Sequence, residues 1–419
     1  MSENSFKIVG GRELYGTIKV QISKNAVLPI MSASLLCAGT VCLKNCPNIS
    51  DFHNMTQILK KMGVKVLKLG NHYIFNAKNA TNANIDCELA KTMRSSVFLI
   101  GSTLVKFKTV VFVSAGGCKI GKRPIDLHIK AFKDLGVQII ETENKVIFDA
   151  ATAHAGVVKL KIPSVGATEN IVQFASLLKG KTTIINPAKE PEVVDLCNFL
   201  NSMGAKIKGA GTNKITIYGV NKLKSTQYQP ISDRIITATI MSAVALCGGN
   251  VTLTNTNYKH NKNFINKLRR IGCVIKIKND IINVNSNKPL TSLKRIETGY
   301  FPKFPTDLQS FMVVLACLSR GSTIIKENIF ENRFLIASEL NKMGANIKQL
   351  NDRTVIVKGV NSLNSSNVEA KDLRGGASLV LAGLVASGET VVNGVELIDR
   401  GYDHLENMLA SLGANIKRQ

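Results

Sequence analysis

One stretch of the chain has residue types that could do covalent chemistry. Residues 114–124 read SAGGCKIGKRP, so three glycines surround Cys118, and Lys119, Lys122 and Arg123 follow it. Glycine permits backbone shapes closed to other residues, and nearby cations and backbone N–H groups lower a thiol pKa from about 8.5. Of nine cysteines, only Cys118 has this electropositive setting. The stretch therefore predicts a reactive thiolate, with a surface turn holding an incidental cysteine as the alternative.

The same stretch matches part of a nucleotide-binding motif. Gly116 to Gly121 followed by Lys122 fits G-x-x-x-x-G-K, but a P-loop then needs Ser or Thr to hold Mg²⁺. Arg123 and Pro124 stand there instead, which disfavours an NTP-hydrolysing site. No cysteine pair has C-x-x-C spacing, so we expect no metal. Most other cysteines lie in apolar runs, which indicates small buried side chains in a reducing, cytoplasmic compartment.

A repeated unit must position these residues. A bulky apolar residue, a glycine and a short strand-like run recur six times, at intervals of 68 to 73 residues, with the glycines at Gly63, Gly136, Gly204, Gly272, Gly344 and Gly413. Each copy follows an amphipathic pattern, as in residues 195–207, where apolar residues fall at helical spacing. The glycine stands where a helix needs a left-handed C-cap. Each half-unit is therefore predicted as helix, glycine, strand.

A second helix is predicted earlier in each unit. Residues 169–180, 308–321 and 377–388 are apolar nearly all round and run into β-branched segments. A helix that is apolar on every face must be buried on every face. The sequence thus favours α/β packing with helices inside a wall of sheet, although the pattern alone does not fix a threefold closure.

Length, charge and hydropathy narrow the class of protein. A chain of 419 residues predicts two domains. The net charge of +25 attracts polyanions, but the lysines are dispersed and aromatics make up only 5%, so a nucleic-acid-binding protein is the weaker alternative. The apolar stretch after Lys24 is broken by Pro29 and Gly39, and that after Arg234 ends within about a dozen residues, both too short for a span of about 20. We expect buried helices and no membrane insertion.

Several motifs resemble the enolpyruvyl transferase family, which also contains EPSP synthase, and within it the branch that acts on UDP-N-acetylglucosamine. The resemblance covers nearly the whole chain and is carried by residues 8–11, 23–26, 91–94, 117–128, 163–168, 190–192, 304–307, 330–334, 372–374 and 399–402. The cysteine stretch is the most specific, because EPSP synthases share the fold and lack it. Transfer to another acceptor, as in EPSP synthase, is therefore the nearer alternative.

The resemblance implies two inside-out α/β barrel domains, each of three repeated units with buried helices. Residues 23–231 would form the domain that carries Cys118, and residues 1–22 with 232–419 the other, with the active site in the cleft between them. It further implies a monomer or weak oligomer that needs no cofactor.

The implied reaction moves the enolpyruvyl group of phosphoenolpyruvate to the 3′-hydroxyl of UDP-N-acetylglucosamine, the first committed step of peptidoglycan synthesis. Cys118 would donate a proton, carry a phosphoenolpyruvate adduct and be the target of the epoxide antibiotic fosfomycin. Asp307 would be the base, and Lys24, Arg123 and Arg400 would hold the phosphoenolpyruvate anion. The other implied substrate-binding residues are Asn25, Arg94, Pro124, Ile125, Asp126, Leu127, Ile162, Pro163, Ser164, Val165, Ile329, Asp372 and Arg374.

Three positions depart from the family pattern. Ile162 stands where some members have Lys, Ile236 where members usually have Glu, and Ala238 where Gly is common. The first removes one expected nucleotide contact. The other two follow the predicted crossover between domains and bear on that junction more than on the chemistry.

Overall fold

The computed structural model describes residues 5–85, 88–113, 125–143, 145–287 and 289–419. These fall into two compact units. We call the chain up to Gln21 together with Ser232–Gln419 the terminal unit, and the described residues between Ile22 and Ile231 the inserted unit. Each unit has its own hydrophobic core.

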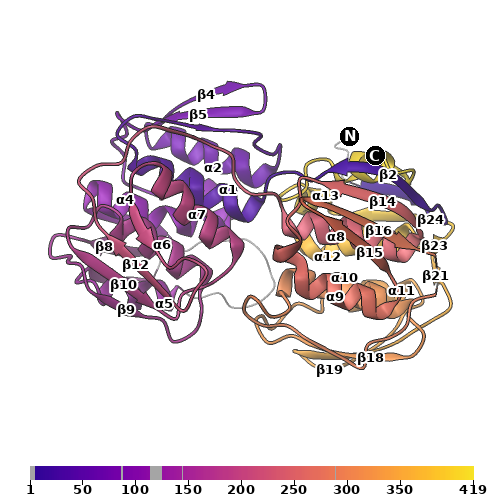
Figure 1. Cartoon of the computed structure of the whole chain (residues 1–419). Helices are drawn as coiled ribbons and strands as arrows, with labels where there is room; N and C mark the ends of the chain where they lie inside the picture. Colours follow the sequence, from indigo (N-terminus) through magenta and orange to yellow (C-terminus); the bar gives the residue numbers. More distant parts are fainter. Residues whose placement is uncertain (1–4, 86–87, 114–124, 144, 288) are drawn as a thin grey trace. The chain divides into compact units, whose positions relative to one another are not determined.

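The inserted unit contains three copies of one βαβαββ repeat (Figure 1). The first consists of β13 (Thr226–Tyr228), α1 (Lys24–Ala33), η1 (Ser34–Leu36), β3 (Thr40–Leu43), α2 (Ser50–Lys61), β4 (Lys65–Leu69) and β5 (His72–Asn76). The second consists of α3 (Glu88–Thr92), η2 (Arg94–Phe98), α4 (Leu99–Phe107), β6 (Thr109–Val113), α5 (Asp126–Lys133), β7 (Gln138–Glu141) and β8 (Lys145–Asp149). The third consists of β9 (Val157–Lys159), α6 (Val165–Ala175), β10 (Lys181–Ile185), α7 (Pro191–Ser202), β11 (Lys206–Lys208) and β12 (Lys214–Tyr218).

The terminal unit contains three more copies. The first consists of β2 (Leu14–Lys19), α8 (Arg234–Cys247), β14 (Gly249–Thr254), η3 (Tyr258–Asn261), α9 (Lys262–Ile271), β15 (Val274–Lys278) and β16 (Ile281–Ser286). The second consists of β17 (Arg295–Glu297), η4 (Thr306–Leu308), α10 (Gln309–Cys317), β18 (Ser322–Lys326), α11 (Ile336–Lys342), β19 (Asn346–Asn351) and β20 (Thr354–Lys358). The third consists of β21 (Leu363–Asn364), β22 (Asn367–Glu369), α12 (Leu373–Gly383), β23 (Ala386–Ser387), β24 (Glu389–Asn393), α13 (Val395–Ile398), α14 (Leu405–Ala410), β25 (Asn415–Arg418) and β1 (Ser5–Val9).

The sheets share one strand order. In β9-β10-β12-β11 the first pair is parallel and the others antiparallel, and β17-β18-β20-β19 and β2-β14-β16-β15 repeat the pattern. Strands from distant parts of the chain complete some sheets: β13 pairs with β3, and β1 lies between β24 and β25. In each unit, a strand from one end of its sequence thus completes a sheet formed by strands from the other end. In the second repeat the parallel position is reduced to one bridge, between Asn84 and Val111.

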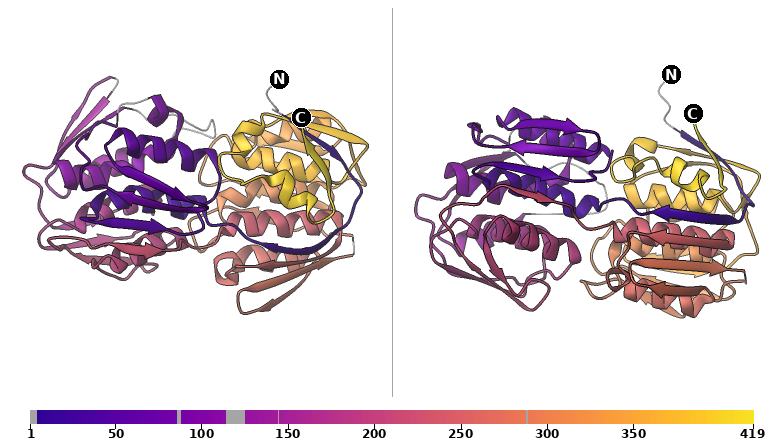
Figure 2. Two further views of the ribbon diagram at one scale, coloured as in Figure 1. Left: turned by 90° about the horizontal axis from the view of Figure 1, so that it is seen from above. Right: turned by 45° about the horizontal axis from the view of Figure 1, so that its top comes forward.

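The helices predicted to be buried are buried. All nine residues of α10 and all eleven of α12 are buried. Figure 2 shows strands along the outside of the terminal unit and helices behind them, and α8, α10 and α12 contact one another. In the inserted unit α4 contacts both α1 and α6. The prediction of interior helices is confirmed, although α6 begins at Val165 and ends at Ala175, earlier than residues 169–180 suggest.

The six repeat glycines end helices in the left-handed conformation, as predicted: Gly272 is the C-cap residue of α9, and the others lie one or two residues beyond the C-cap residues of α2, α5, α7, α11 and α14. All have positive φ, between 76° and 120°, a conformation that glycine adopts without a steric penalty. The apolar stretch after Lys24 forms the predicted buried helix, α1, with Pro29 inside it. Pro29 lacks the N–H that would bond to the carbonyl of Asn25, and the packing of a helix in which residues 26–33 are all buried outweighs that one lost bond. Among the described residues no helix is long and apolar enough to cross a membrane.

Candidate active site

Lys24 and Asn25 form the start of α1 in the inserted unit. The Nζ atom of Lys24 lies 2.8 Å from Oδ2 of Asp51, and the two side chains are only 12% and 2% exposed. An ion pair that is so well shielded from water costs desolvation and holds both side chains in one geometry. The ammonium group of Lys24 is thus fixed at the N-terminus of a buried helix, beside the half-buried Asn25.

Arg94, Asp126 and Leu127 are placed by a junction of three elements. The Nδ2 atom of Asn170 on α6 donates to Nδ1 of His128 on α5 at 3.0 Å and to the carbonyl of Val97 on η2 at 3.0 Å. Burial, followed by the positive charge of Arg94, lowers the pKa of His128 to about 3, so its ring is neutral at pH 7. Because Asn170 holds η2 and α5 together, it fixes where Arg94 and the start of α5 lie.

Gly166 makes this junction possible. A Cβ atom on Gly166 would lie 2.8 Å from Cε1 of His128. The neighbouring Ser164 is the N-cap of α6, and its side chain accepts from the N–H of Ala167 at 3.3 Å. Pro163, Ser164 and Val165 are half-buried, whereas Ile162 is 43% exposed. The predicted nucleotide-contact segment therefore lies at a helix N-terminus, where backbone N–H groups and the helix dipole favour anions.

In the terminal unit, three predicted residues share one network. Oδ1 of Asp307 lies 3.3 Å from Nε of Arg374 and 3.3 Å from a guanidinium nitrogen of Arg333. Arg333 also lies 3.5 Å from Oδ1 of Asp372. The two arginines and Asp372 are less than 10% exposed, while the Asp307 side chain is 26% exposed. Asp307 is thus the accessible end of a shielded network, oriented by two guanidinium groups.

Helix α12 and a buried tyrosine position Arg374. Asp372 is the N-cap of α12 and accepts from the backbone N–H groups of Arg374 and Gly375. The Arg374 guanidinium lies 5.6 Å from the ring centre of Tyr402, whose hydroxyl lies 2.9 Å from that of Thr239. Burial alone lowers the pKa of Arg374, but Tyr402, Asp307 and Asp233 outweigh it and the pKa is raised. Arg374 is therefore a permanent cation.

Glu327 organises the loop before α10 and the segment that holds Ile329. It is fully buried, and its Oε1 accepts from the Thr298 hydroxyl at 2.8 Å and from the N–H of Ile329 at 2.7 Å. Its Oε2 accepts from the hydroxyl of Thr306 at 3.0 Å. Because Thr306 precedes Asp307, one carboxylate fixes both the half-buried Ile329 and the start of η4.

Arg400 follows Asp399, a residue held by a bidentate ion pair. Arg418 on β25 donates through both terminal nitrogens to Asp399, at 2.7 and 2.8 Å. This bidentate contact ties the end of α13 to the sheet edge and restrains the backbone that enters the half-buried Arg400.

Cys118, Arg123 and Pro124 lie outside the described residues, and Ile125 is half-buried as the N-cap of α5. Seven cysteines are described and all are free thiols. Burial raises the pKa of Cys46, Cys197, Cys247 and Cys317 to about 12. These four thiols therefore stay protonated at neutral pH. Within the described part of the chain, no cluster of three or more His, Cys, Asp or Glu side chains could hold a metal.

Four residues that support the site were missed in the sequence. Asp51 and Glu327 carry no local signal that names their partners. Arg333 lies in a matching motif (residues 330–334), and Tyr402 in another (residues 399–402), so both could have been proposed from the resemblance. Asp307, Asp372 and Arg374 are brought into one network, while Lys24, Arg94 and Arg400 lie on separate elements.

This fold and these charged residues at helix starts agree with the predicted enolpyruvyl transferase. The family model for EPSP synthase (3-phosphoshikimate 1-carboxyvinyltransferase) matches residues 8–409, and the chain belongs to this family. Its sequence is 45% identical, over 99% of both chains, to UDP-N-acetylglucosamine 1-carboxyvinyltransferase 2 of Caldanaerobacter subterraneus subsp. tengcongensis. It is 42% identical to UDP-N-acetylglucosamine 1-carboxyvinyltransferase of Clostridium botulinum, over 99% of this chain and 100% of that protein.

Solved structures share the fold at low sequence identity. The enolpyruvyl transferase NikO from Streptomyces tendae matches with a TM-score of 0.88 at 21% identity, over 99% of this chain and 98% of that one. EPSP synthase from Acinetobacter baumannii matches with a TM-score of 0.74 at 19% identity, over 99% and 100%. The predicted EPSP synthase-like fold of two inside-out α/β barrels is thereby confirmed.

Proposed function

We propose that this protein transfers the enolpyruvyl group of phosphoenolpyruvate to the 3′-hydroxyl of UDP-N-acetylglucosamine and releases phosphate. The observation that carries the proposal is the 45% identity to a curated transferase of that name over 99% of both chains. The cysteine stretch at residues 114–124 supports the same acceptor, because EPSP synthases lack it. The product belongs to the first committed step of peptidoglycan synthesis, which we place in the cytoplasm, with the enzyme a monomer or weak oligomer.

The chemistry is an addition followed by an elimination. In the addition, the 3′-oxygen bonds to C2 of phosphoenolpyruvate, C3 gains a proton and the hydroxyl loses one. In the elimination, the bond from C2 to the phosphate oxygen breaks, C3 loses a proton and the double bond returns. A positioned acid or base contributes typically about 10²–10⁴-fold to such steps. We assign proton delivery to Cys118 and removal of the hydroxyl proton to Asp307.

The described geometry suits Asp307 for this task. Its carboxylate is partly exposed, while the two guanidinium groups at 3.3 Å both contact Oδ1. Arg333 and Arg374 orient the carboxylate through Oδ1, and we propose that this carboxylate takes the proton of the substrate hydroxyl. Lys24, Arg123 and Arg400 would hold the phosphate and carboxylate of phosphoenolpyruvate, since fixed cations stabilise charge as it develops. Asn25 would lie at the reacting centre.

The remaining predicted residues would bind the nucleotide sugar. Arg94 and residues 124–127 would contact its nucleotide part, and residues 162–165 at the start of α6 would hold the diphosphate. Ile329, Asp372 and Arg374 complete the set. Ile162 is exposed and has no charge to offer a phosphate, so backbone N–H groups and Ser164 must contribute more here than in relatives with Lys at that position.

The decisive experiment compares acceptors. Phosphate release from phosphoenolpyruvate is measured with UDP-N-acetylglucosamine and, separately, with shikimate 3-phosphate. We expect turnover with the nucleotide sugar only. Faster turnover with shikimate 3-phosphate would overturn the proposal and assign the chain to the other branch of the family.

A further inference from the structure

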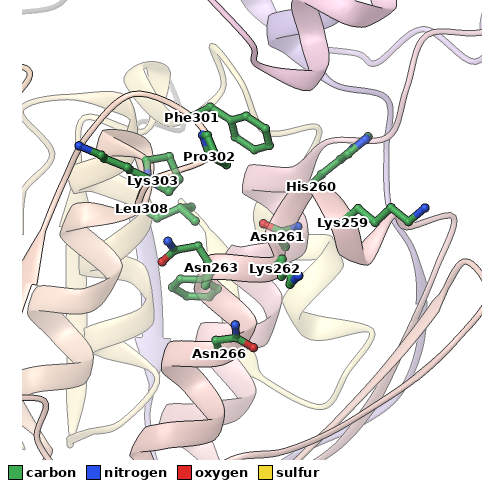
Figure 3. A pocket seen from close by; sticks show the side chains of 12 residues that line it. Lys259, His260, Asn261, Lys262, Asn263, Asn266, Phe301, Pro302, Lys303 and Leu308 are labelled. Carbon is green, nitrogen blue, oxygen red and sulfur yellow. The ribbon is translucent and has the colours of Figure 1, made fainter. Parts of the chain in front are cut away.

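The terminal unit contains a pocket that no proposed substrate contact uses. It has a volume of about 270 Å³ and lies between η3, the start of α9 and the loop before α10 (Figure 3). Its lining residues are Lys259, His260, Asn261, Lys262, Asn263, Phe264, Asn266, Phe301, Pro302, Lys303, Pro305 and Leu308. None of these is a predicted site residue, although Pro305 and Leu308 lie close to Asp307 in the chain.

Lysines lie on both sides of the pocket: Lys259 and Lys262 belong to η3 and the start of α9, and Lys303 follows Pro302 on the loop side (Figure 3). Lys259, Lys262 and Lys303 are exposed, and no acidic residue lines the cavity. Over the described residues, none of these three lysines forms a salt bridge. Burial, and then Arg234, lowers the pKa of His260 to about 4, so its ring is a neutral donor or acceptor at pH 7. Asp307, which adjoins the lining residue Leu308 in the sequence, contacts Arg333 and Arg374.

A buried amide without a partner lies in the same wall. Asn261 is the N-cap residue of α9 and only 3% exposed, yet its side chain makes no cap hydrogen bond. Both Oδ1 and Nδ2 lack a hydrogen-bond partner. Buried amides are normally paired, because an unmade hydrogen bond costs free energy. In the view of Figure 3, Asn261 lies between Lys259 and Leu308.

The helix that starts at this wall adds to the positive potential. Helix α9 has ten residues, and its first N–H groups are not capped by the Asn261 side chain. Helix N-termini favour anions through these N–H groups and the helix dipole. The loop side of the pocket offers the apolar side chains of Phe301, Pro302 and Leu308, with Lys303 beside them. A suitable ligand therefore has an anionic head and a compact apolar body.

We propose that this pocket binds a small organic anion, in which a phosphate, phosphonate or carboxylate group faces Lys259, Lys262 and Asn261 and an apolar group contacts Phe301 and Leu308. Such a site is separate from the proposed phosphoenolpyruvate contacts. The proposal therefore stands or falls independently of the acceptor that the enzyme uses.

The test uses phenylphosphonate, which combines a phosphonate head with an aromatic ring, and calorimetric titration of the full chain. The double variant Lys259→Gln/Lys262→Gln removes both cations from the side of the pocket that contains Asn261. We expect it to bind phenylphosphonate about five- to thirtyfold more weakly, since each partly screened charge contact contributes about 0.5–1 kcal/mol and two are removed. The matched control is Lys276→Gln/Lys348→Gln, which removes two exposed lysines from β15 and β19 of the same unit and should bind as the wild type does.

Two further arms identify the site and the ligand class. Asn261→Leu, which keeps the side-chain size and removes the amide, should also weaken binding. Lys24→Ala should leave it unchanged. Benzoate should bind more weakly than phenylphosphonate, and the neutral analogue benzyl alcohol should not bind. The inference is overturned if Lys24→Ala abolishes binding while the lysine double variant retains it, because the probe then occupies the proposed active site, or if benzyl alcohol binds as well as phenylphosphonate.

Discussion

At the scale of single residues, the orientation of Asp307 depends on Arg333, which the sequence analysis did not assign to the site. A guanidinium group presents several donors in a fixed plane, so Arg333 can contact Asp307 and Asp372 at once. A lysine carries a single compact charge and cannot do both. The orientation of the proposed base is therefore set by the shape of the Arg333 side chain as much as by its charge.

Arg333→Lys should lower kcat by about tenfold or more, which corresponds to about 1.4 kcal/mol of transition-state stabilisation, with a smaller change in KM for the nucleotide sugar. Steady-state kinetics measure both. The control is Arg353→Lys, since Arg353 pairs with Glu331 through an ion pair in which both side chains are more than one third exposed. Equal kcat values for the two variants would show that the planar guanidinium group of Arg333 does not orient Asp307.

Fosfomycin should alkylate Cys118 and spare the other thiols. Reactivity follows the thiolate fraction and access, and burial raises the pKa of Cys197 and Cys317 to about 12. At pH 7.5 these groups are therefore protonated and shielded, whereas Cys118 stands among Lys119, Lys122 and Arg123. Mass spectrometry of peptides after stoichiometric treatment locates the adduct.

Cys118→Asp is the matched variant for this experiment. It keeps a proton donor and removes the sulfur nucleophile, so it should retain some turnover and resist the drug. Modification of Cys37, Cys247 or Cys317 in the folded protein, or full sensitivity of Cys118→Asp, would contradict the assignment of Cys118 as the reactive residue.

At the scale of elements, the contact of α5 with α6 leaves no room for another atom. A Cβ on Gly166 would lie 2.8 Å from Cε1 and 3.0 Å from Nε2 of His128, and the ring cannot move freely because Asn170 donates to it. Gly166→Ala should destabilise the chain by about 1–3 kcal/mol, the usual cost of overpacking, and raise KM for the nucleotide sugar, because α5 carries Asp126 and Leu127.

Chemical denaturation measures this change in the free energy of unfolding. Gly156→Ala is the control, since the nearest atom to its Cβ would be 3.7 Å away and its φ is not in the left-handed region. The interpretation fails if the two substitutions cost the same.

The same junction should make stability depend on pH. The unfolded chain takes up a proton on His128 near pH 6.5, but the folded chain does so only near the lowered pKa of about 3. Between these values the unfolded state binds more protons. This contribution to stability is therefore present above pH 6.5 and is lost as the pH falls, by up to about 1.4 kcal/mol per pH unit.

His128→Gln removes the titrating ring and keeps an acceptor for Asn170. Between pH 7 and pH 5, the free energy of unfolding should fall more for the wild type than for this variant. Burial raises the pKa of Asp195 to about 6, so protonation of Asp195 stabilises the folded state as the pH falls. This effect is the same in both proteins and cancels when their free energies of unfolding are subtracted. The control is His154→Gln at an exposed position. Parallel pH profiles for wild type and His128→Gln would refute the argument.

Features that depend on residues close together in the sequence could be predicted, and contacts between distant segments could not. The repeat glycines and interior helices were predictable, because a helix C-cap and an all-apolar helix are local patterns. The ion pair of Lys24 with Asp51 was not, because it joins two helices whose packing the local pattern does not give. The same holds for Glu327, whose partners Thr298, Thr306 and Ile329 meet only in the folded loops.

At the scale of the whole molecule, the described residues cross between the units at two places, residues 21–22 and 231–232, and these two segments are hydrogen-bonded to each other. The N–H of Ser23 donates to the carbonyl of Ile231 at 2.8 Å, and the N–H of Asp233 donates to that of Gln21 at 2.9 Å. Asp195 on α7 adds to this by accepting from the N–H of Ile231 at 3.1 Å. The inserted unit therefore begins and ends at adjacent points, as a domain inserted into another can do.

This topology predicts which fragments fold alone. The hydrophobic core of the inserted unit is formed only by residues between Ile22 and Leu223, with no member in the core of the terminal unit. A fragment of residues 22–231 should therefore unfold cooperatively by itself. A fragment of residues 232–419 should not, because it lacks β2, which pairs with β14, and β1, which lies between β24 and β25.

A third protein tests whether the missing strands, and not the shorter length, prevent residues 232–419 from folding. Residues 1–21 joined to residues 232–419 by a short glycine-rich linker restore β1 and β2, and the hydrogen bond from Asp233 to Gln21 shows that the two ends meet. This chain should regain a cooperative thermal transition, measured by circular dichroism, that residues 232–419 lack. Cooperative unfolding of residues 232–419 without the N-terminal strands would show that the terminal unit does not need them. Failure of residues 22–231 to fold would show that its core depends on the rest of the chain.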